Sequence, residues 1–196
     1  TSDLHAFAAY SSALRNLAAK LVKVSGDLQF LSSGPRTGIF EITLPAMQPG
    51  SSIMPGKVNP VMAELVNIVS MKVMGNDAAV GMAQSFGLLQ LNAYEPVAAI
   101  AILESQHLLV RVLAAFRTKC VDGVVANRAA CEEHFDRSVG IVTALNPLLG
   151  YEKTTELAAE AMRTNKGVLQ LVRERKLLTE EQIKKVMNVK ALTGQE

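Results

Sequence analysis

Cysteine and aromatic residues are scarce in this chain. Its 196 residues include two cysteines, no tryptophan and only 5% aromatic residues. Two cysteines cannot form the disulfide framework that stabilises many small secreted domains. The first residues also lack the basic and apolar regions of a secretory signal. We therefore expect a reducing, cytoplasmic location.

Metal-ligating patterns are also lacking. The close pair Cys131 and His134, in CEEHFD, lies in an acidic stretch that is more typical of a solvated helix face than of a metal site. Phosphate-binding patterns such as G-x-x-x-x-G-K-[ST] and G-x-G-x-x-G do not occur. We expect no organic cofactor, and no metal site can be identified from these residues, which leaves activation by a divalent metal open.

No excess of charge of one sign is present. Twenty Lys and Arg residues face eighteen Asp and Glu residues, and the basic residues are scattered apart from RERK at 173–176. That cluster is typical of charge near a helix C-terminus. The longest apolar run, Val97 to Leu103, is too short to cross a bilayer. We expect neither a nucleic-acid partner nor a membrane partner.

Long helices account for most of the first two thirds of the chain. Small and apolar residues recur at spacings of three and four from Asp3 to about Ser32, which predicts a long bundle helix. They are Phe7, Ser11, Leu14, Ala18, Leu21, Ser25 and Leu28. Two more long helices are predicted, from Pro60 to about Met82 and from about Asn92 to Arg117. The Pro- and Gly-rich stretch 33–59 reads as a loop with one short strand in GIFEITLP.

Beyond the break VDGVVAN at 121–127 the predicted helices become shorter. They cover about 128–136, 139–148, 152–164, 167–174 and 179–188. Thr179 and Gln182 form a capping-box pattern for the last of them. We expect an all-α fold with two domains, a central helical bundle at 1–126 and a small C-terminal helical domain at 127–196.

The second and third long helices are apolar on nearly every side. A chain of this length does not supply enough partners to cover such helices, so they indicate contacts with further chains. We therefore expect a homo-oligomeric helical bundle.

The loop PGSSIMPGKVNP, residues 49–60, concentrates the polar chemistry of the chain. Asn59 is a strong N-cap residue and Pro60 suits the first helical position, so a long helix is expected to start here. Its unpaired N–H groups and the charge of Lys57 would favour a carboxylate or a phosphate. Gly50 and Gly56 give the backbone freedom to move.

A serine on this loop could act as a base. Positive potential from Lys57 and from the helix dipole would stabilise its alkoxide, and would also stabilise a carbanion delocalised into a carboxylate. The chemistry indicated is proton abstraction next to a carboxylate. Loops of Gly, Ser and Pro before helices are nevertheless common, so composition alone leaves an ordinary loop as the alternative.

The string GSSIMPGKVNP resembles the signature of the aspartase/fumarase superfamily, G-S-S-x-M-P-x-K-x-N-P. Further segments resemble parts of the same enzymes in the same order, namely GPRTGIFEITLP, VMGND, LQLN, SVGIVTALNPLLGY and LLTEEQ. The resemblance covers essentially the whole chain. It implies a homotetramer whose active sites are shared between subunits and which acts on a small dicarboxylate.

The resemblance also implies roles for individual residues. Ser51 would be the catalytic base, while Ser52, Lys57 and Asn59 would bind substrate. Glu64 matches the carboxylate that in these enzymes pairs with a histidine of another chain, although an ordinary first-turn Glu is the alternative. The rest of the flexible loop would be Gly50, Ile53, Met54, Pro55, Gly56 and Val58.

Two branches of the superfamily fit the sequence. Val58 disfavours argininosuccinate and adenylosuccinate lyases, which have a basic residue there. Asn67 in NPVMAELVN and Glu95 before Pro96 favour aspartate ammonia-lyases, and class II fumarases are the alternative. A structural recruit of the fold without catalysis is disfavoured, because Ser51, Lys57 and Asn59 are all present.

The sequence begins with Thr1-Ser2-Asp3 and lacks the Thr-His motif and the Gly/Ser/Thr motif that lie upstream in this superfamily. None of the three histidines has the required neighbours. We therefore expect a fragment that does not turn over substrate by itself.

Overall fold

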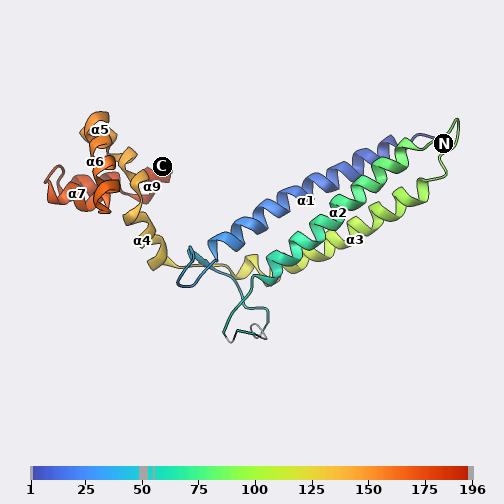
Figure 1. Cartoon of the computed structure of the whole chain (residues 1–196), viewed down its shortest axis with the longest axis horizontal. Helices are drawn as coiled ribbons and strands as arrows, with labels where there is room; N and C mark the ends of the chain where they lie inside the picture. Colours follow the sequence, from blue (N-terminus) through green and yellow to red (C-terminus); the bar gives the residue numbers. More distant parts are fainter. Residues whose placement is uncertain (1, 49–52, 55, 194–196) are drawn as a thin grey trace. The chain divides into compact units, whose positions relative to one another are not determined.

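The computed structural model describes residues 2–48, 53–54 and 56–193 (Figure 1). The chain divides into two compact units, Thr1–Asn127 and Arg128–Glu196. Both units are built from helices, as the sequence predicts.

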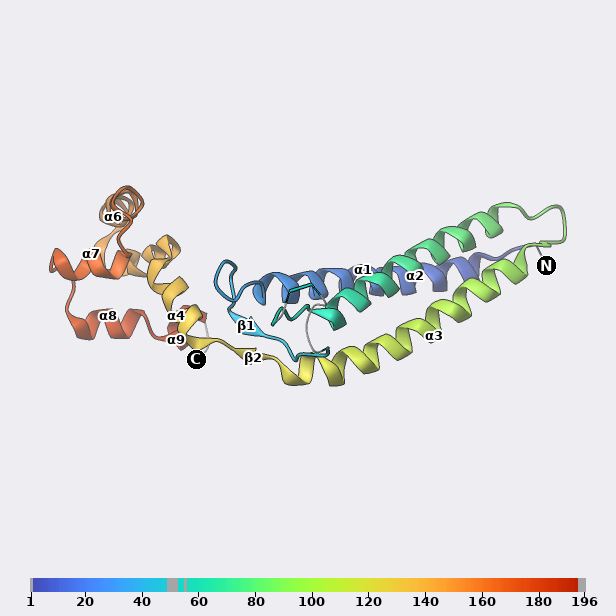
Figure 2. The same ribbon diagram turned by 60° about the horizontal axis from the view of Figure 1, so that its bottom comes forward.

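Three long helices form the first unit. They are α1 (His5–Leu31), α2 (Val61–Ser85) and α3 (Glu95–Lys119). Successive helices run antiparallel, and α2 packs against both of the others (Figures 1 and 2). The three predicted long helices are thus confirmed. The third begins three residues later than predicted because Asn92 instead makes a turn, in which its Oδ1 accepts from the Tyr94 N–H at 2.9 Å.

The inner face of α1 follows the predicted spacing. Ser11, Ala18, Leu21 and Ser25 are buried, and they lie three, four or seven residues apart. Ala18 and Leu21 join Val66, Val73, Leu109 and others in the main apolar core of the bundle. Phe7 belongs to the same predicted spacing, but its side chain is 37% exposed in this chain.

Polar side chains of α2 cross to both neighbouring helices. The Ser25 hydroxyl of α1 donates to Asn67 Oδ1 at 2.5 Å. On the other side, the Asn76 amide donates to the Ala101 carbonyl (3.2 Å), Glu104 Oε2 (3.0 Å) and Ser105 Oγ (3.0 Å) of α3. Because a buried amide without partners is costly, the bonds of Asn76 favour one register of α2 against α3, and the bond between Ser25 and Asn67 adds to this on the side of α1.

A two-stranded sheet lies at the end of the bundle where α1 and α3 end. Strand β1 (Ile42–Thr43) pairs antiparallel with β2 (Val125–Ala126), with Ile42 opposite Ala126 and Thr43 opposite Val125. The 3₁₀ helix η1 (Val121–Gly123) connects α3 to β2. The predicted strand in GIFEITLP is confirmed, whereas its partner in VDGVVAN was not predicted.

Five α-helices make up most of the second unit: α4 (Arg128–Arg137), α6 (Tyr151–Thr164), α7 (Val168–Glu174), α8 (Glu180–Val186) and α9 (Val189–Thr193). They surround their own apolar core, which includes Leu145, Leu157 and Val172. The capping box of Thr179 and Gln182 is confirmed, with both reciprocal bonds present.

The predicted helix at 139–148 is wrong as a single element. The chain forms a 3₁₀ helix η2 (Val139–Leu145) and then the short α5 (Asn146–Leu149). Pro147 explains the break, because it has no N–H to donate and its ring would clash with a carbonyl one turn earlier. It is tolerated in the first turn of α5.

Large apolar side chains remain exposed on the outer faces of α2 and α3. Ile68 and Met71 of α2 are 60% and 62% exposed, and Ile100 and Val110 of α3 are 68% and 70% exposed. This confirms that the chain does not cover these helices by itself. By length and composition alone, Glu95–Gly123 could also cross a membrane, but a core helix of a soluble protein passes the same test.

The Lys72–Glu104 ion pair between α2 and α3 predicts a pH-dependent stability. The Lys72 Nζ lies 2.9 Å from Glu104 Oε2, and this hydrogen bond, followed by that from Asn76, lowers the pKa of Glu104 below its ordinary value of 4.5. A lowered folded-state pKa contributes stability that is present above pH 4.5 and is lost as the pH falls through the folded-state value. We expect Glu104→Gln to destabilise the protein at pH 7 and to have a smaller effect below pH 4.5.

Urea unfolding of both proteins at several pH values measures this difference. Since both side chains are partly exposed, the effect at pH 7 should be modest and should fall with added salt. An effect of Glu104→Gln that is the same at both pH values would contradict the assignment.

Candidate functional site

Part of the signature loop lies outside the described residues. This applies to Gly50, Ser51, Ser52 and Pro55, and so to the predicted base itself. The predicted roles of these four residues stay predictions. Pro49, the first residue of the loop, also lies outside the described residues, whereas residues 53–54 and 56–60 are described and the latter lead directly into α2.

The described part of the loop contains a turn that requires glycine. The Lys57 N–H donates to the Met54 carbonyl at 3.2 Å, and Gly56 between them has a φ of 81°. That value favours glycine because a Cβ would strain the backbone. Ile53 and Val58 are 85% and 53% exposed, so the loop displays apolar side chains as well as the Lys57 cation.

The predicted start of α2 is wrong by one residue. Pro60 is the N-cap, with φ −77° and ψ 57°, and Val61 is the first helical residue. Asn59 lies one position earlier, where its carbonyl accepts from the Val61 N–H at 2.8 Å. With these angles Pro60 is the central residue of an inverse γ-turn closed by the bond from the Val61 N–H to the Asn59 carbonyl, so the helix starts only at Val61.

The Asn59 side chain is therefore not used as the cap of α2. It is half-buried just ahead of the first turn, and Lys57 lies exposed two residues before it. The N–H groups of Met62 and Ala63 lie in that turn, where a helix has no carbonyl partner for them. Within the described residues, Lys57 makes no ion pair with an acid. A helix N-terminus and an available cation together favour an anionic ligand.

Glu64 lies in the first turn of α2 and is exposed. Its N–H donates to the Pro60 carbonyl at 3.0 Å, which closes the turn. Its carboxylate also suits the positive end of the helix dipole, so this position agrees with the ordinary first-turn reading as well as with the predicted one.

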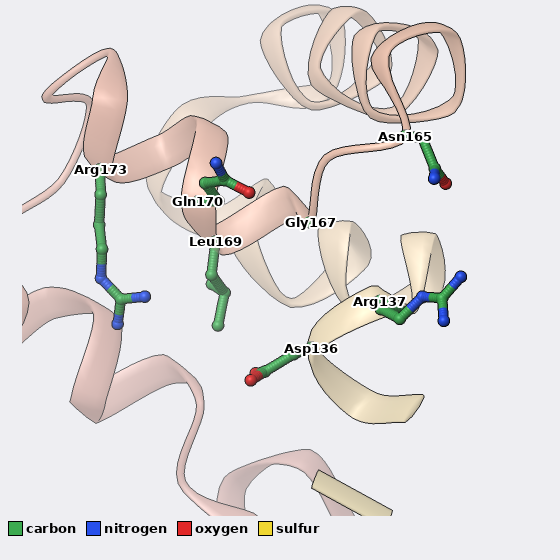
Figure 3. A pocket seen from close by; sticks show the side chains of 7 residues that line it. All are labelled: Asp136, Arg137, Asn165, Gly167, Leu169, Gln170 and Arg173. Atoms are coloured by element: carbon green, nitrogen blue, oxygen red, sulfur yellow. The ribbon is translucent and has the colours of Figure 1, made fainter. Parts of the chain in front are cut away.

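The second unit contains a polar pocket of about 340 Å³. Figure 3 shows Arg137 and Asn165 on one side of it and Arg173 on the other, with Asp136 between them. Arg173 Nε donates to Glu180 Oε1 at 2.8 Å, and this bond lowers the pKa of the Glu180 carboxyl. Arg137 Nη1 lies 3.5 Å from Glu133 Oε1. Because its arginines are already matched by carboxylates, the pocket is not a strong anion site.

Cys120 is not placed to act as a reactive nucleophile. Among the described residues, no group of three or more His, Cys, Asp or Glu side chains could hold a metal ion. Cys120, at the end of α3, is 2% exposed, and burial raises the pKa of its thiol. A buried thiol of raised pKa is inert at neutral pH.

Two family profiles match the chain. The family described as Lyase matches residues 1–75, and the family described as Fumarase C C-terminus matches residues 141–194. The first match includes the whole signature loop and the start of α2, and the second lies within the C-terminal unit.

Curated relatives match nearly the whole chain. An aspartate ammonia-lyase of Pseudomonas canavaninivorans is 51% identical over 187 residues, which are 95% of this chain and 40% of the relative. An aspartate ammonia-lyase of Escherichia coli K12 is 46% identical over 192 residues, 98% of this chain and 40% of the relative. The chain thus spans about two fifths of the length of these relatives.

Solved structures agree with the fold. A fumarate lyase:delta crystallin from Brucella melitensis, bound to cobalt, superposes with a TM-score of 0.90 at 44% identity over 99% of this chain and 42% of that one. A class II fumarase from Schistosoma mansoni superposes with a TM-score of 0.86 at 36% identity, over 95% of this chain and 39% of that one. The resemblance to the aspartase/fumarase superfamily is confirmed.

The burial of Cys120 predicts slow modification of its thiol. In a Cys131→Ser variant, Cys120 is the only cysteine left. We expect iodoacetamide at pH 8 to alkylate it at least about tenfold more slowly in the native protein than in urea. Mass spectrometry of timed samples measures both rates, and the Cys120→Ser/Cys131→Ser double variant is the control for reaction elsewhere. Equal rates would show that the thiol is accessible in the native fold.

Proposed function

We propose that this chain is the segment of an aspartate ammonia-lyase that carries its signature loop. The observation that carries the proposal is the string Gly50–Pro60, which leads into the N-terminus of α2 in a chain 46–53% identical to curated aspartate ammonia-lyases. The reaction is the reversible elimination of ammonia from L-aspartate to give fumarate.

In this proposal the loop and the start of α2 divide the chemistry between them. Ser51 removes a proton from the carbon next to the substrate carboxylate, and the C–N bond to the leaving ammonia then breaks. Lys57, Asn59 and the first turn of α2 hold that carboxylate, with a further hydrogen bond from Ser52. Their positive potential stabilises the aci-carboxylate formed on proton removal. Glu64 is assigned to pair with a histidine from another chain.

Class II fumarase is the second candidate. It would use the same loop to eliminate water from malate, and the Schistosoma structure supports it through its shared fold. The identity to that enzyme is 36%, against 46–53% for the aspartate ammonia-lyases. This difference favours ammonia as the leaving group.

The proposal includes a homotetramer with shared active sites in a reducing cytoplasm. Exposed apolar side chains on α2 and α3 support the assembly, since few monomers leave so many on adjacent helices. In the tetramer these faces would pack on further copies of the chain, not on lipid or nucleic acid. Residues that complete each site would come from other parts of the protein and from neighbouring subunits.

Assays of the protein expressed from the complete gene test the reaction. Ultraviolet absorbance follows fumarate formed from aspartate or from malate, and we expect turnover of aspartate. Ser51→Ala should lower kcat by about 100-fold or more, because no other group is assigned to the base. Lys57→Met should raise KM and also lower kcat, since it removes a charge that binds the carboxylate and stabilises the aci-carboxylate.

Thr164→Val is a suitable control, since its hydroxyl bonds the Glu160 carbonyl of its own exposed turn. Turnover of malate but not of aspartate would favour the fumarase. A Ser51→Ala enzyme with normal kcat would exclude the proposed mechanism for both substrates.

Light scattering tests the assembly. We expect the complete protein to be a tetramer at micromolar concentration, and the 196-residue chain to self-associate but to have no lyase activity. A monomeric 196-residue chain would count against the role given to α2 and α3, and activity from it would show that its site is complete.

A further inference from the structure

The segment between α3 and α4 bonds the stretch of chain that leads into the signature loop. We call residues 40–45 the stem of the loop. The Asn127 amide donates from Nδ2 to the Phe40 carbonyl at 2.9 Å, and its Oδ1 accepts from the Thr43 hydroxyl at 3.0 Å. Its main-chain N–H donates to the Glu41 carbonyl at 2.8 Å. A single residue thus makes three bonds to the stem.

A close backbone contact holds the far end of the stem. A Cβ added to Gly123 would lie 2.6 Å from Cγ of Pro45, closer than carbon atoms approach without displacement. Only glycine therefore lets η1 pack directly on this proline. The β1–β2 pairing lies between the two contacts, with Thr43 opposite Val125.

The short sheet needs these additional contacts. Two residues in each strand provide few ladder hydrogen bonds, and an isolated two-stranded pair is marginal in water. Asn127 adds a donor and an acceptor on one planar group, a combination that an aspartate would not supply. We call Asn127, Gly123 and β2 together the clamp.

The clamp and α2 fix opposite ends of the signature loop. Pro45 lies a few residues before the loop begins at residue 49, and the loop ends at Pro60, where α2 starts. We propose that Asn127 and Gly123 are positioning residues for the lyase reaction, acting through the stem and touching no substrate. This inference rests on the proposed function, because it concerns how the stem positions the proposed base Ser51.

The clamp should affect catalysis more than binding. Lys57 and Asn59 belong to the α2 side of the loop, to which the clamp makes no hydrogen bond among the described residues. A displaced stem would misplace the base, and displacements of about 1 Å at a reacting group can lower rates about 100-fold. Carboxylate binding would be largely retained.

Threonine 43 offers the sharpest test. In the protein from the complete gene, we expect Thr43→Val to lower kcat about tenfold or more, with KM changed less than about twofold. Thr43→Ser keeps the hydroxyl and should restore most of kcat. The kcat of Asn127→Asp should lie between that of the wild type and that of Asn127→Ala, because the aspartate keeps the acceptor for Thr43 and loses the donor to Phe40. Gly123→Ala should lower kcat to a similar extent as Thr43→Val, again with little change in KM.

Thr164→Val again serves as the matched control for loss of a threonine hydroxyl, and its kcat should be unchanged. The inference is overturned if Thr43→Val and Asn127→Ala both keep wild-type kcat. It is also overturned if Thr43→Ser is as impaired as Thr43→Val, because the bond to Asn127 would then not be the cause.

Hydrogen exchange separates the clamp from the proposed function. In the unliganded protein, Thr43→Val should speed exchange of amides in β1 and β2 while amides within α1 and α2 keep their protection. Unchanged exchange in both strands would overturn the clamp whatever the activity. If the wild-type protein turns over neither aspartate nor malate, the proposed function fails, and exchange still reports whether the clamp holds the stem.

Discussion

The bundle depends on α2 being held in register between α1 and α3. Burial of apolar side chains supplies the main driving force, but it is not directional and does not by itself select one register. Asn67 bonds Ser25 of α1, and Asn76 bonds three groups of α3. A buried amide left without partners costs about 1–3 kcal/mol, so sliding of α2 past α3 is penalised at Asn76, and sliding past α1 loses the bond between Ser25 and Asn67.

The register of α2 is also the register of its N-terminus. Lys57 and Asn59 lead directly into the first turn, so the same polar contacts that orient α2 fix where these side chains start. The signature loop therefore runs from the stem, which is bonded to β2 and Asn127, to the N-terminus of α2. A functional group is placed most precisely when the elements that support it are rigid.

Local patterns in the sequence predicted what local interactions determine. The spacing of small and apolar residues gave α1, and Thr179 with Gln182 gave the start of α8. The chemistry of the candidate site was predicted from the string GSSIMPGKVNP and its resemblance to the aspartase/fumarase signature, without any knowledge of its geometry. Two residues of β2 are too few for a pattern, and the bonds of Asn127 join positions more than eighty residues apart. The shift of the α2 cap to Pro60 depends on backbone angles that composition does not specify.

The apolar side chains on the outer faces of α2 and α3 have a consequence for how such a protein can change. Under the proposed assembly, Ile68 and Ile100 are surface residues of one chain but interior residues of the whole. A substitution there is repeated by symmetry in every subunit, so a small loss of packing is multiplied. The outer faces of these helices should therefore accept as little variation as the centre of the bundle.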